Sequence, residues 1–495
     1  MKFIKSNLNN QAVIEPSKEQ EAKPIWQCQV EESLSPNPQF SPSKSLQKNL
    51  QGKRLPLNEI PYSPKLIHSH YLNGFIRYQK GIEISSDKYQ CIRCGNEDQQ
   101  LFGVLPCARC DTDCVYCRKC INMGRLSACT PLISWCGPPI SSFTQKVQCT
   151  SKVQLSSGQQ EASNKVVQAI KQKSKLLVWA VCGSGKTEVL FQGIEYALNH
   201  NLNLCIATPR TDVVLELGPR MKEAFPTAEL IALYGGSEDR GNIAPFVLST
   251  THQLLRFYRY FDVIIIDEVD AFPYSVEPML TQAVQQALKA ESALIYLTAT
   301  PDQAFTKQEE LEVVTIPARY HRYSLPVPIF HWCGNWQKGL SKKRLPPNVL
   351  KWIQKRLQNK KQTFLFVPQV KILKQVVQIL RHLDKRIEGV HAADNDRKAK
   401  VERFRNGESP ILVTTTILER GVTVSNIDVA VLGAEDRIFT ESALVQIAGR
   451  AGRKANYPTG DVVYFHYGKT NEMVKAKQQI ERMNKEALQK GLIDR

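Results

Sequence analysis

Two series of short apolar runs, each alternating with helical stretches, dominate the chain from about residue 155 onward. The first series reads KLLVWAV, LCIAT, FVLST, DVIIID and ALIYLTAT, and the second reads TFLFVP, EGVHA, PILVTTT, VAVLG and DVVYFHYG. Runs that are apolar throughout are typical of strands buried on both faces of a sheet. Their alternation with helices predicts two α/β lobes, each built on a parallel sheet.

Breaks in composition mark the edges of these lobes. A Ser/Gln/Lys-rich connector precedes the first lobe, a proline-rich break from Pro317 to Pro347 precedes the second, and the tail has helical periodicity. Residues 1–65 are polar and broken by prolines, which favours an extended or poorly ordered arm with at most a short docked strand. The expected domains are an arm (1–65), a cysteine-rich module (66–140), lobe 1 (150–325), lobe 2 (326–470) and a C-terminal surface helix (471–495).

The charge and the hydropathy pattern restrict the partners and the compartment. The net charge is +18, from 65 basic and 47 acidic residues. Such an excess attracts polyanions, nucleic acid first and an anionic membrane surface second. No apolar run reaches eighteen residues and the N-terminal lysines have no apolar core behind them, so we expect neither a membrane span nor a secretory signal. In the reducing compartment this implies, dense cysteines favour metal binding over disulfides.

A phosphate-binding loop is predicted at residues 180–187, which read AVCGSGKT between an apolar strand and a helical stretch. The run fits A/G-x4-G-K-[ST]. In such a loop glycines turn backbone N–H groups toward the phosphates, the lysine contacts the β and γ oxygens, and the hydroxyl ligates Mg²⁺. The expected nucleotide-binding residues are Ala180, Val181, Cys182, Gly183, Ser184, Gly185, Lys186 and Thr187.

Two further elements complete the chemistry of nucleotide hydrolysis. In DVIIIDEVD (262–270), Asp267 would hold Mg²⁺ and Glu268 would polarise the attacking water, unless the pair is only a helix start. In QIAGRAGR (446–453), a helix would present Gln446, Arg450 and Arg453 on one face. The arginines would then stabilise transition-state charge, whereas the alternative reading is a basic turn.

Taken in this order, the elements resemble those of a superfamily 2 helicase-type motor over about residues 155–470. The resemblance implies two RecA-like lobes that close on ATP. It also implies that Gln159, in LSSGQ, reads adenine. TPRTDV (208–213) and STTHQL (249–254) would grip the nucleic-acid backbone, and TTTILERGVT (414–423) would touch both backbone and nucleotide.

Residues 89–136 hold nine of the fourteen cysteines. The pairs Cys91-x2-Cys94 and Cys117-x2-Cys120 can supply four thiolates to a closed tetrahedral zinc site, with an iron–sulfur cluster as the minor alternative. The other cysteines could complete a second site or replace one of these ligands; they are Cys107, Cys110, Cys114, Cys129 and Cys136. A segment this small, with Pro, Gly and charge throughout, buries too little core to fold without metal.

A Cys-x2-Cys-Gly knuckle, the run YCRKCINMGR and a two-lobe motor together resemble the ComFA family of late-competence ATPases, over about residues 70–495. The family's zinc element maps onto Cys91, Cys94, Cys117 and Cys120. The resemblance implies a cytoplasmic DNA-dependent ATPase, peripheral at the inner face of the membrane, that uses ATP, Mg²⁺ and Zn²⁺. It implies translocation of single-stranded DNA during natural competence, together with other late-competence proteins and the membrane DNA-uptake machinery.

Two other functions fit part of this pattern. A PriA-like replication-restart helicase also joins cysteines to such a motor, but there the cysteines interrupt the helicase core, whereas here they precede it. A non-catalytic scaffold that binds nucleotide and zinc would need no turnover. Measuring ATP hydrolysis with and without single-stranded DNA separates a motor from a scaffold.

Overall fold

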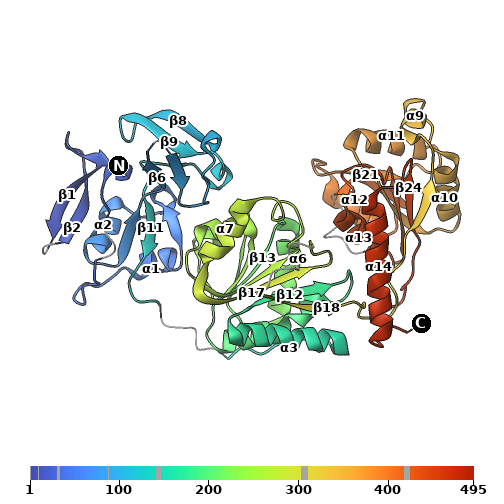
Figure 1. Ribbon diagram of the computed structural model, residues 1–495, viewed down its shortest axis with the longest axis horizontal. Helices are drawn as coiled ribbons and strands as arrows, with labels where there is room; N and C mark the ends of the chain where they lie inside the picture. Colours follow the sequence, from blue (N-terminus) through green and yellow to red (C-terminus); the bar gives the residue numbers. More distant parts are fainter. Residues whose placement is uncertain are drawn as a thin grey trace. The chain divides into compact units, whose positions relative to one another are not determined.

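The computed structural model describes residues 2–8, 11–30, 34–86, 88–140, 146–302, 310–416 and 424–494. These residues form two compact units (Figure 1). The first unit contains Met1–Ser151, Val167–Lys175 and Phe191–Tyr296, and the second contains Lys152–Val166, Leu176–Leu190 and Leu297–Arg495.

The N-terminal part of the first unit is a small α+β module. One antiparallel sheet has the order β2-β1-β3 and another has the order β4-β11-β5. Their strands are β1 (Lys2–Leu8), β2 (Gln11–Ser17), β3 (Lys23–Pro24), β4 (Arg54–Pro56), β5 (Ile76–Gln79) and β11 (Leu132–Trp135). The helices are η1 (Ile25–Gln27), α1 (Lys44–Leu50), η2 (Leu57–Glu59) and α2 (Pro64–Leu72).

Residues 1–65 are part of this module, not the extended arm that their composition favoured. One core joins Phe3, Ile14 and Leu50 to Tyr78 and Ile133, so a boundary at residue 65 separates no structural unit. The few apolar side chains of the segment are widely spaced among polar residues and prolines, and they become buried only against residues that lie later in the chain. Such long-range burial leaves no local signal in the sequence.

The cysteine-rich part of the module consists of short antiparallel strands. Strands β6 (Ile82–Ser85) and β7 (Lys88–Cys91) form a hairpin. A separate sheet has the order β10-β9-β8. Its strands are β8 (Phe102–Cys107), β9 (Thr112–Cys117) and β10 (Leu126–Ser127), with the short helices η3 (Gln99–Leu101) before it and η4 (Ile121–Met123) within it.

The first-lobe sheet has seven strands in the order β14-β15-β13-β16-β17-β12-β18. The pairs of β13 with β15 and β16, and of β14 with β15, are parallel, as predicted. The strands are β12 (Lys175–Ala180), β13 (Leu204–Thr208), β14 (Leu230–Leu233), β15 (Phe246–Thr250), β16 (Phe261–Asp267), β17 (Leu288–Thr298) and β18 (Leu311–Ile316). The helices are α3 (Ser157–Gln172), α4 (Lys186–Val189), α5 (Phe191–Asn199), α6 (Thr211–Ala224), η5 (Glu238–Gly241), η6 (Thr251–Arg256) and α7 (Pro278–Ala287).

The second-lobe sheet has six strands in the order β19-β24-β23-β20-β22-β21, and its pairings are parallel. Its strands are β19 (Ile329–Trp332), β20 (Gln362–Phe366), β21 (Glu388–Val390), β22 (Ile411–Thr414), β23 (Ile427–Leu432) and β24 (Val462–His466). Its helices are α9 (Trp336–Ser341), α10 (Pro347–Gln358), α11 (Val370–Leu380), α12 (Arg397–Arg405), α13 (Glu441–Ala448) and α14 (Asn471–Gln489).

Successive residues of β20 point into different cores of the second lobe. Phe364 packs in one core with Leu444 of α13 and Met473 of α14, whereas Leu365 packs in another with residues of α10 and α11. Helices therefore cover both faces of this sheet, as the alternating pattern predicted. Across the described part of the chain, no helix combines the length and the apolar character needed to cross a membrane.

Candidate functional site

The predicted phosphate loop connects β12 to α4, and its two glycines adopt backbone conformations that other residues rarely reach. Gly183 has φ 82° and Gly185 has φ 72°, and Gly185 is the N-cap of α4. Because a Cβ strains the backbone at such φ values, the glycines allow the turn that brings backbone N–H groups to the start of a helix. The segment thus has the strand–turn–helix context that a phosphate loop requires.

Gln159 of α3 is hydrogen-bonded to the phosphate loop, and both lie in the second unit. Its Nε2 donates to the carbonyl oxygen of Ser184 at 2.7 Å, and its Oε1 accepts from the backbone N–H of Ser156 at 2.8 Å. The side chain is only 3% exposed, and a Cβ added at Gly185 would lie 2.5 Å from its amide nitrogen. The geometry therefore gives Gln159 a part in shaping the loop, while its predicted contact with adenine stays a prediction.

The predicted QIAGRAGR element packs directly on the phosphate loop. Cys182 Sγ donates to Gln446 Oε1 at 2.9 Å, and a Cβ added at Gly449 would lie 2.4 Å from that of Cys182. Gln446 and Arg450 are buried, with exposures of 6% and 1%. A basic turn that only solvates the surface would not be buried in this way.

The expectation that one helix carries Gln446, Arg450 and Arg453 is wrong. Helix α13 ends at Ala448, and the following residues form turns in which Gly452 has φ 68°. Gly449 is the C-cap of this helix, and its lack of a side chain lets it approach Cys182 closely. Arg453 Nε donates to the carbonyl oxygen of Gly449 at 3.3 Å, so it folds back on its own turn.

Arg319 is a candidate residue that no sequence motif indicated. Its guanidinium donates to the carbonyl oxygens of Cys182 at 3.2 Å, Gly449 at 3.1 Å and Gly452 at 2.5 Å. It is 1% exposed, and burial lowers the pKa of Arg319 to about 10, which leaves it charged at neutral pH. It follows β18 at the start of the proline-rich break, close to His321 and Arg322, and no local pattern singles it out among these basic residues.

The DVIIIDEVD run covers the end of strand β16 and the turn after it. Asp267 is the last residue of β16, whose four preceding residues are fully buried. Glu268 has φ 58°, in the left-handed region, so the chain turns sharply at the end of the strand. The acid pair therefore ends a buried strand and does not begin a helix, and the roles predicted for its two carboxylates remain predictions.

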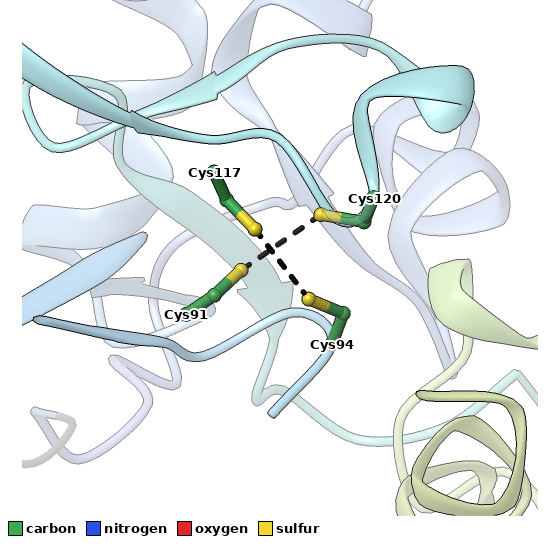
Figure 2. Close-up of side chains that lie close together, drawn as sticks. All are labelled: Cys91, Cys94, Cys117 and Cys120. Carbon is green, nitrogen blue, oxygen red and sulfur yellow. Dashed lines mark hydrogen bonds between the residues drawn. The ribbon is translucent and has the colours of Figure 1, made fainter. Parts of the chain in front are cut away.

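The four cysteines predicted as zinc ligands converge in the module. Figure 2 shows the sulfurs of Cys91, Cys94, Cys117 and Cys120 pointing toward one centre. The Sγ atoms of Cys91 and Cys120 lie 3.8 Å apart, and those of Cys94 and Cys117 lie 3.7 Å apart. A tetrahedral ion with Zn–S bonds of about 2.3 Å would separate its sulfurs by about 3.8 Å. The four buried thiols therefore have the spacing of a structural zinc site.

Arg93 supplies the positive charge that such a thiolate cluster needs. Its Nε and Nη2 donate to Cys120 Sγ at 3.4 and 3.0 Å, and its Nη1 lies 3.6 Å from Glu59 Oε1. Hydrogen bonds from neighbouring thiols, that of Cys117 first, together with the charge of Arg93, lower the pKa of Cys120. The thiolate form, which binds metal, is favoured at this position.

The cysteine centre is tied to the first lobe through the same charges. Glu59 also pairs with Arg256 of η6 at 3.0 Å, and Arg256 Nη1 lies 3.8 Å from Met123 Sδ beside the centre. A second ion pair joins Lys119, between two of the cysteines, to Glu277 at 2.6 Å. The module is thus docked on η6 and the residues before α7.

A pocket of about 240 Å³ lies at this junction. It is lined by Asn122 and Met123 of the module and by eight residues of the first lobe, namely Pro209, Thr211, Gly235, Arg240, Thr250, His252, Gln253 and Arg256. The two loops predicted to grip nucleic acid, TPRTDV and STTHQL, therefore line the same pocket as the module. The third such element, TTTILERGVT, falls largely at 417–423, outside the described residues.

Known protein families match both the N-terminal module and the two lobes of the chain. The family model for the competence protein ComFA N-terminal domain matches residues 37–134, across the boundary predicted at residue 65. Models for the res subunit of type III restriction enzymes and for the helicase conserved C-terminal domain match residues 152–303 and 347–455. The chain is also similar in fold to S. cerevisiae Dbp5 bound to RNA and ADP BeF3, with a TM-score of 0.50 and 15% identity over 70% of this chain and 94% of that one.

Two curated relatives match most of the chain. Competence protein ComFA of Bacillus subtilis is 50% identical over 445 residues, which cover 89% of this chain and 96% of that one. Competence protein ComFA of Streptococcus pneumoniae is 37% identical over 400 residues, covering 78% and 91%. The resemblance indicated by the motifs is therefore confirmed: the chain belongs to the ComFA family of competence proteins, as a competence-related motor of the helicase type.

Proposed function

We propose that this protein is an ATPase that depends on single-stranded DNA and drives transforming DNA into the cytoplasm during natural competence. The observation that carries the proposal is the packing of the QIAGRAGR element on the phosphate loop, through Cys182 and Gln446 and through Arg319. This contact brings the arginines of the element to the phosphate loop, beside the place where charge would develop during hydrolysis.

The residues of the site take the roles that nucleotide hydrolysis needs. In the proposal, Lys186 contacts the β- and γ-phosphates, and Thr187 with Asp267 holds Mg²⁺. Glu268 orients the attacking water, and Arg450 and Arg453 face the charge that develops on the transferred phosphate. The buried position of Arg450 supports this role, since a desolvated guanidinium stabilises such charge more than an exposed one.

The pocket between the module and the first lobe supports contact with a nucleic-acid strand. Its lining offers hydroxyls from Thr211 and Thr250, the imidazole of His252 and the guanidinium of Arg240, all of which suit a phosphate backbone. The net charge of +18 favours the same ligand. Affinity for single-stranded DNA should therefore fall by about 0.7 log units per tenfold increase in salt for each phosphate neutralised.

Membership of the ComFA family supports the proposed setting. We propose peripheral association with the inner face of the membrane, through other late-competence proteins and the membrane DNA-uptake machinery. Zinc at Cys91, Cys94, Cys117 and Cys120 would keep the module folded and docked on the first lobe, since metal binding supplies much of the folding energy of such modules.

The test is ATP turnover by the full chain with no nucleic acid, single-stranded DNA, duplex DNA or RNA. We expect turnover to rise most with single-stranded DNA. A wild-type protein that binds ATP but shows no turnover with any of the four would be a scaffold. Stimulation by duplex alone would instead point to a helicase of the replication-restart kind.

A further inference from the structure

A second group of four cysteines lies in the module, apart from the centre shown in Figure 2. The Sγ atoms of Cys107, Cys110, Cys114 and Cys129 all lie within 4.8 Å of one another. Those of Cys107 and Cys129 are 3.7 Å apart, which again matches the edge of about 3.8 Å in a tetrahedral zinc–sulfur site. It is also far longer than the bond of about 2.05 Å in a disulfide.

The chain builds this second group with the same turn that it uses for the first. In the first centre, the N–H of Gly95 donates to the carbonyl oxygen of Cys91 at 2.8 Å, and Gly95 has φ 71°. In the second, the N–H of Asp111 donates to the carbonyl oxygen of Cys107 at 2.8 Å, and Asp111 has φ 54°. A left-handed residue after a Cys-x2-Cys pair thus closes both knuckles.

The other two thiols come from neighbouring strands that pairing holds in place. Cys114 lies on β9, opposite Leu105 of β8. Cys129 follows β10, where the N–H of Ala128 donates to the carbonyl oxygen of Val115 at 2.8 Å. The four thiols therefore come from two knuckle positions and two strand-anchored positions, brought together by the sheet β10-β9-β8.

We propose that Cys107, Cys110, Cys114 and Cys129 bind a second zinc ion. Buried cysteines can also pack as small apolar side chains. That alternative does not explain why the other residues between Cys107 and Cys114 are all exposed, namely Ala108, Arg109, Asp111, Thr112 and Asp113. A hairpin end with so little apolar surface has no core in which thiols would pack. Coordination of one metal ion accounts for their convergence.

The surroundings of this site indicate a structural role at the outer end of the module. The site ties the tip of the β8–β9 hairpin to the segment after β10, and Asp111 of that tip pairs with Lys2 of β1 at 3.0 Å. The first centre, by contrast, is linked to the first lobe: Arg93 pairs with Glu59, which also pairs with Arg256 of η6, and Lys119 pairs with Glu277 just before α7. Since Cys107 is only half-buried, the second zinc should also leave sooner in the presence of a chelator.

The test is the zinc content of the purified full chain, measured by mass spectrometry per chain. We expect two zinc ions in the wild type, about one in Cys110→Ser and in Cys129→Ser, and two in the matched control Cys136→Ser. A wild type with one ion that Cys110→Ser does not remove would overturn the proposal. Iron in place of zinc in the same measurement would overturn the identity of the metal.

A second measurement needs no substitution. Replacing the metal of the wild type with Co²⁺ should give the absorption of tetrahedral cobalt thiolate at twice the intensity, per chain, of one four-thiolate site. Stepwise removal by a chelator should then show a fast and a slow phase of equal size. A single phase with the intensity of one site would contradict the proposal even if the serine variants failed to fold.

Discussion

Two buried arginines organise the two candidate sites, and they differ in what balances their charge. Arg93 lies beside Cys120 Sγ and Glu59, and these negative groups raise its pKa although burial alone would lower it. Arg319 donates to three carbonyl oxygens, and burial lowers its pKa to about 10. Within the described residues, no carboxylate pairs with Arg319.

The difference separates a structural charge from one that is available to a ligand. Arg93 is fully compensated inside the module, so its role is to keep the cysteine centre and Glu59 together. Arg319 lies beside the phosphate loop with partial charges only as partners, and an anion there would relieve the cost of its burial. We therefore expect substitutions at Arg93 to change stability and metal content, and substitutions at Arg319 to change ATP turnover.

The largest expected effect comes from the phosphate loop itself. Lys186→Ala removes the full charge proposed to contact the β- and γ-phosphates, so ATP turnover should fall by at least about 10²–10³-fold. Binding of single-stranded DNA, zinc content and thermal stability should stay close to wild type. Turnover is measured at saturating single-stranded DNA, with the exposed Lys222→Ala as control. Wild-type turnover in Lys186→Ala would show that the loop is not the hydrolytic site.

The next largest effect is expected at Arg93, whose charge is balanced by neighbouring negative groups. Arg93→Ala leaves the Cys120 thiolate without its cation and leaves Glu59 paired with Arg256 alone. The free energy of unfolding should therefore fall by about 3 kcal/mol, the lower end for a broken buried pair. Zinc content should fall with it. Denaturant unfolding and metal analysis check this result.

Arg109→Ala is the matched control, because Arg109 holds the same place in the second Cys-x2-Cys knuckle but is exposed. It should cost little stability. Equal losses in the two variants would mean that burial beside the cysteine centre is not what makes Arg93 important.

Local patterns in the sequence predicted part of the fold and part of the candidate sites. Short local spacings predicted the phosphate loop, the acid pair and the first four cysteines, and the apolar runs predicted the parallel sheets. Strands β14 and β18 were missed, and both lie at an edge of the seven-stranded sheet, where burial is incomplete. The apolar run of β14 is only four residues long, and Glu312 and Thr315 interrupt that of β18. An edge strand gives a weak periodic signal.

Long-range contacts account for the rest. Arg319 contacts carbonyl oxygens at least 130 residues away in both directions, and nothing local distinguishes it from other arginines. The order of residues 1–65 likewise depends on a core shared with residues up to Ile133. The helix predicted to carry Arg450 and Arg453 ends at Ala448, before both arginines, and Gly449 then packs against Cys182. The pattern of glycines and arginines alone does not show where the helix ends.

A buried lysine offers a third, smaller test of uncompensated charge. Lys53 Nζ donates to the carbonyl oxygens of Asn242 at 2.9 Å and Arg240 at 3.4 Å, and burial lowers the pKa of Lys53 to about 8. Since the unfolded chain binds this proton up to about pH 10.4, stability should rise as pH increases from 8 toward 10, by about 2 kcal/mol.

Lys53→Met should abolish that part of the rise, whereas the exposed Lys48→Met should retain it. The measurement is the denaturant midpoint at several pH values, compared as a slope so that other titrating groups cancel. The same slope in wild type and Lys53→Met would show that the lysine keeps its ordinary pKa in the folded protein.

The smallest effect is expected for a substitution that keeps the charge of Arg319 and changes only its geometry. It is the most specific test of the difference between Arg319 and Arg93. Arg319→Lys retains a cation beside the phosphate loop, but a lysine ammonium cannot reproduce the planar fork that serves the carbonyl oxygens of Cys182, Gly449 and Gly452. If Arg319 positions the QIAGRAGR element on the loop, kcat should fall by about tenfold, or about 1.4 kcal/mol, while zinc content and DNA affinity stay unchanged. Arg322→Lys is the control, since Arg322 lies three residues on and pairs with Asp494 at the surface. A loss of stability with unchanged kcat would instead make Arg319 a structural charge like Arg93, and the distinction between the two sites would fail.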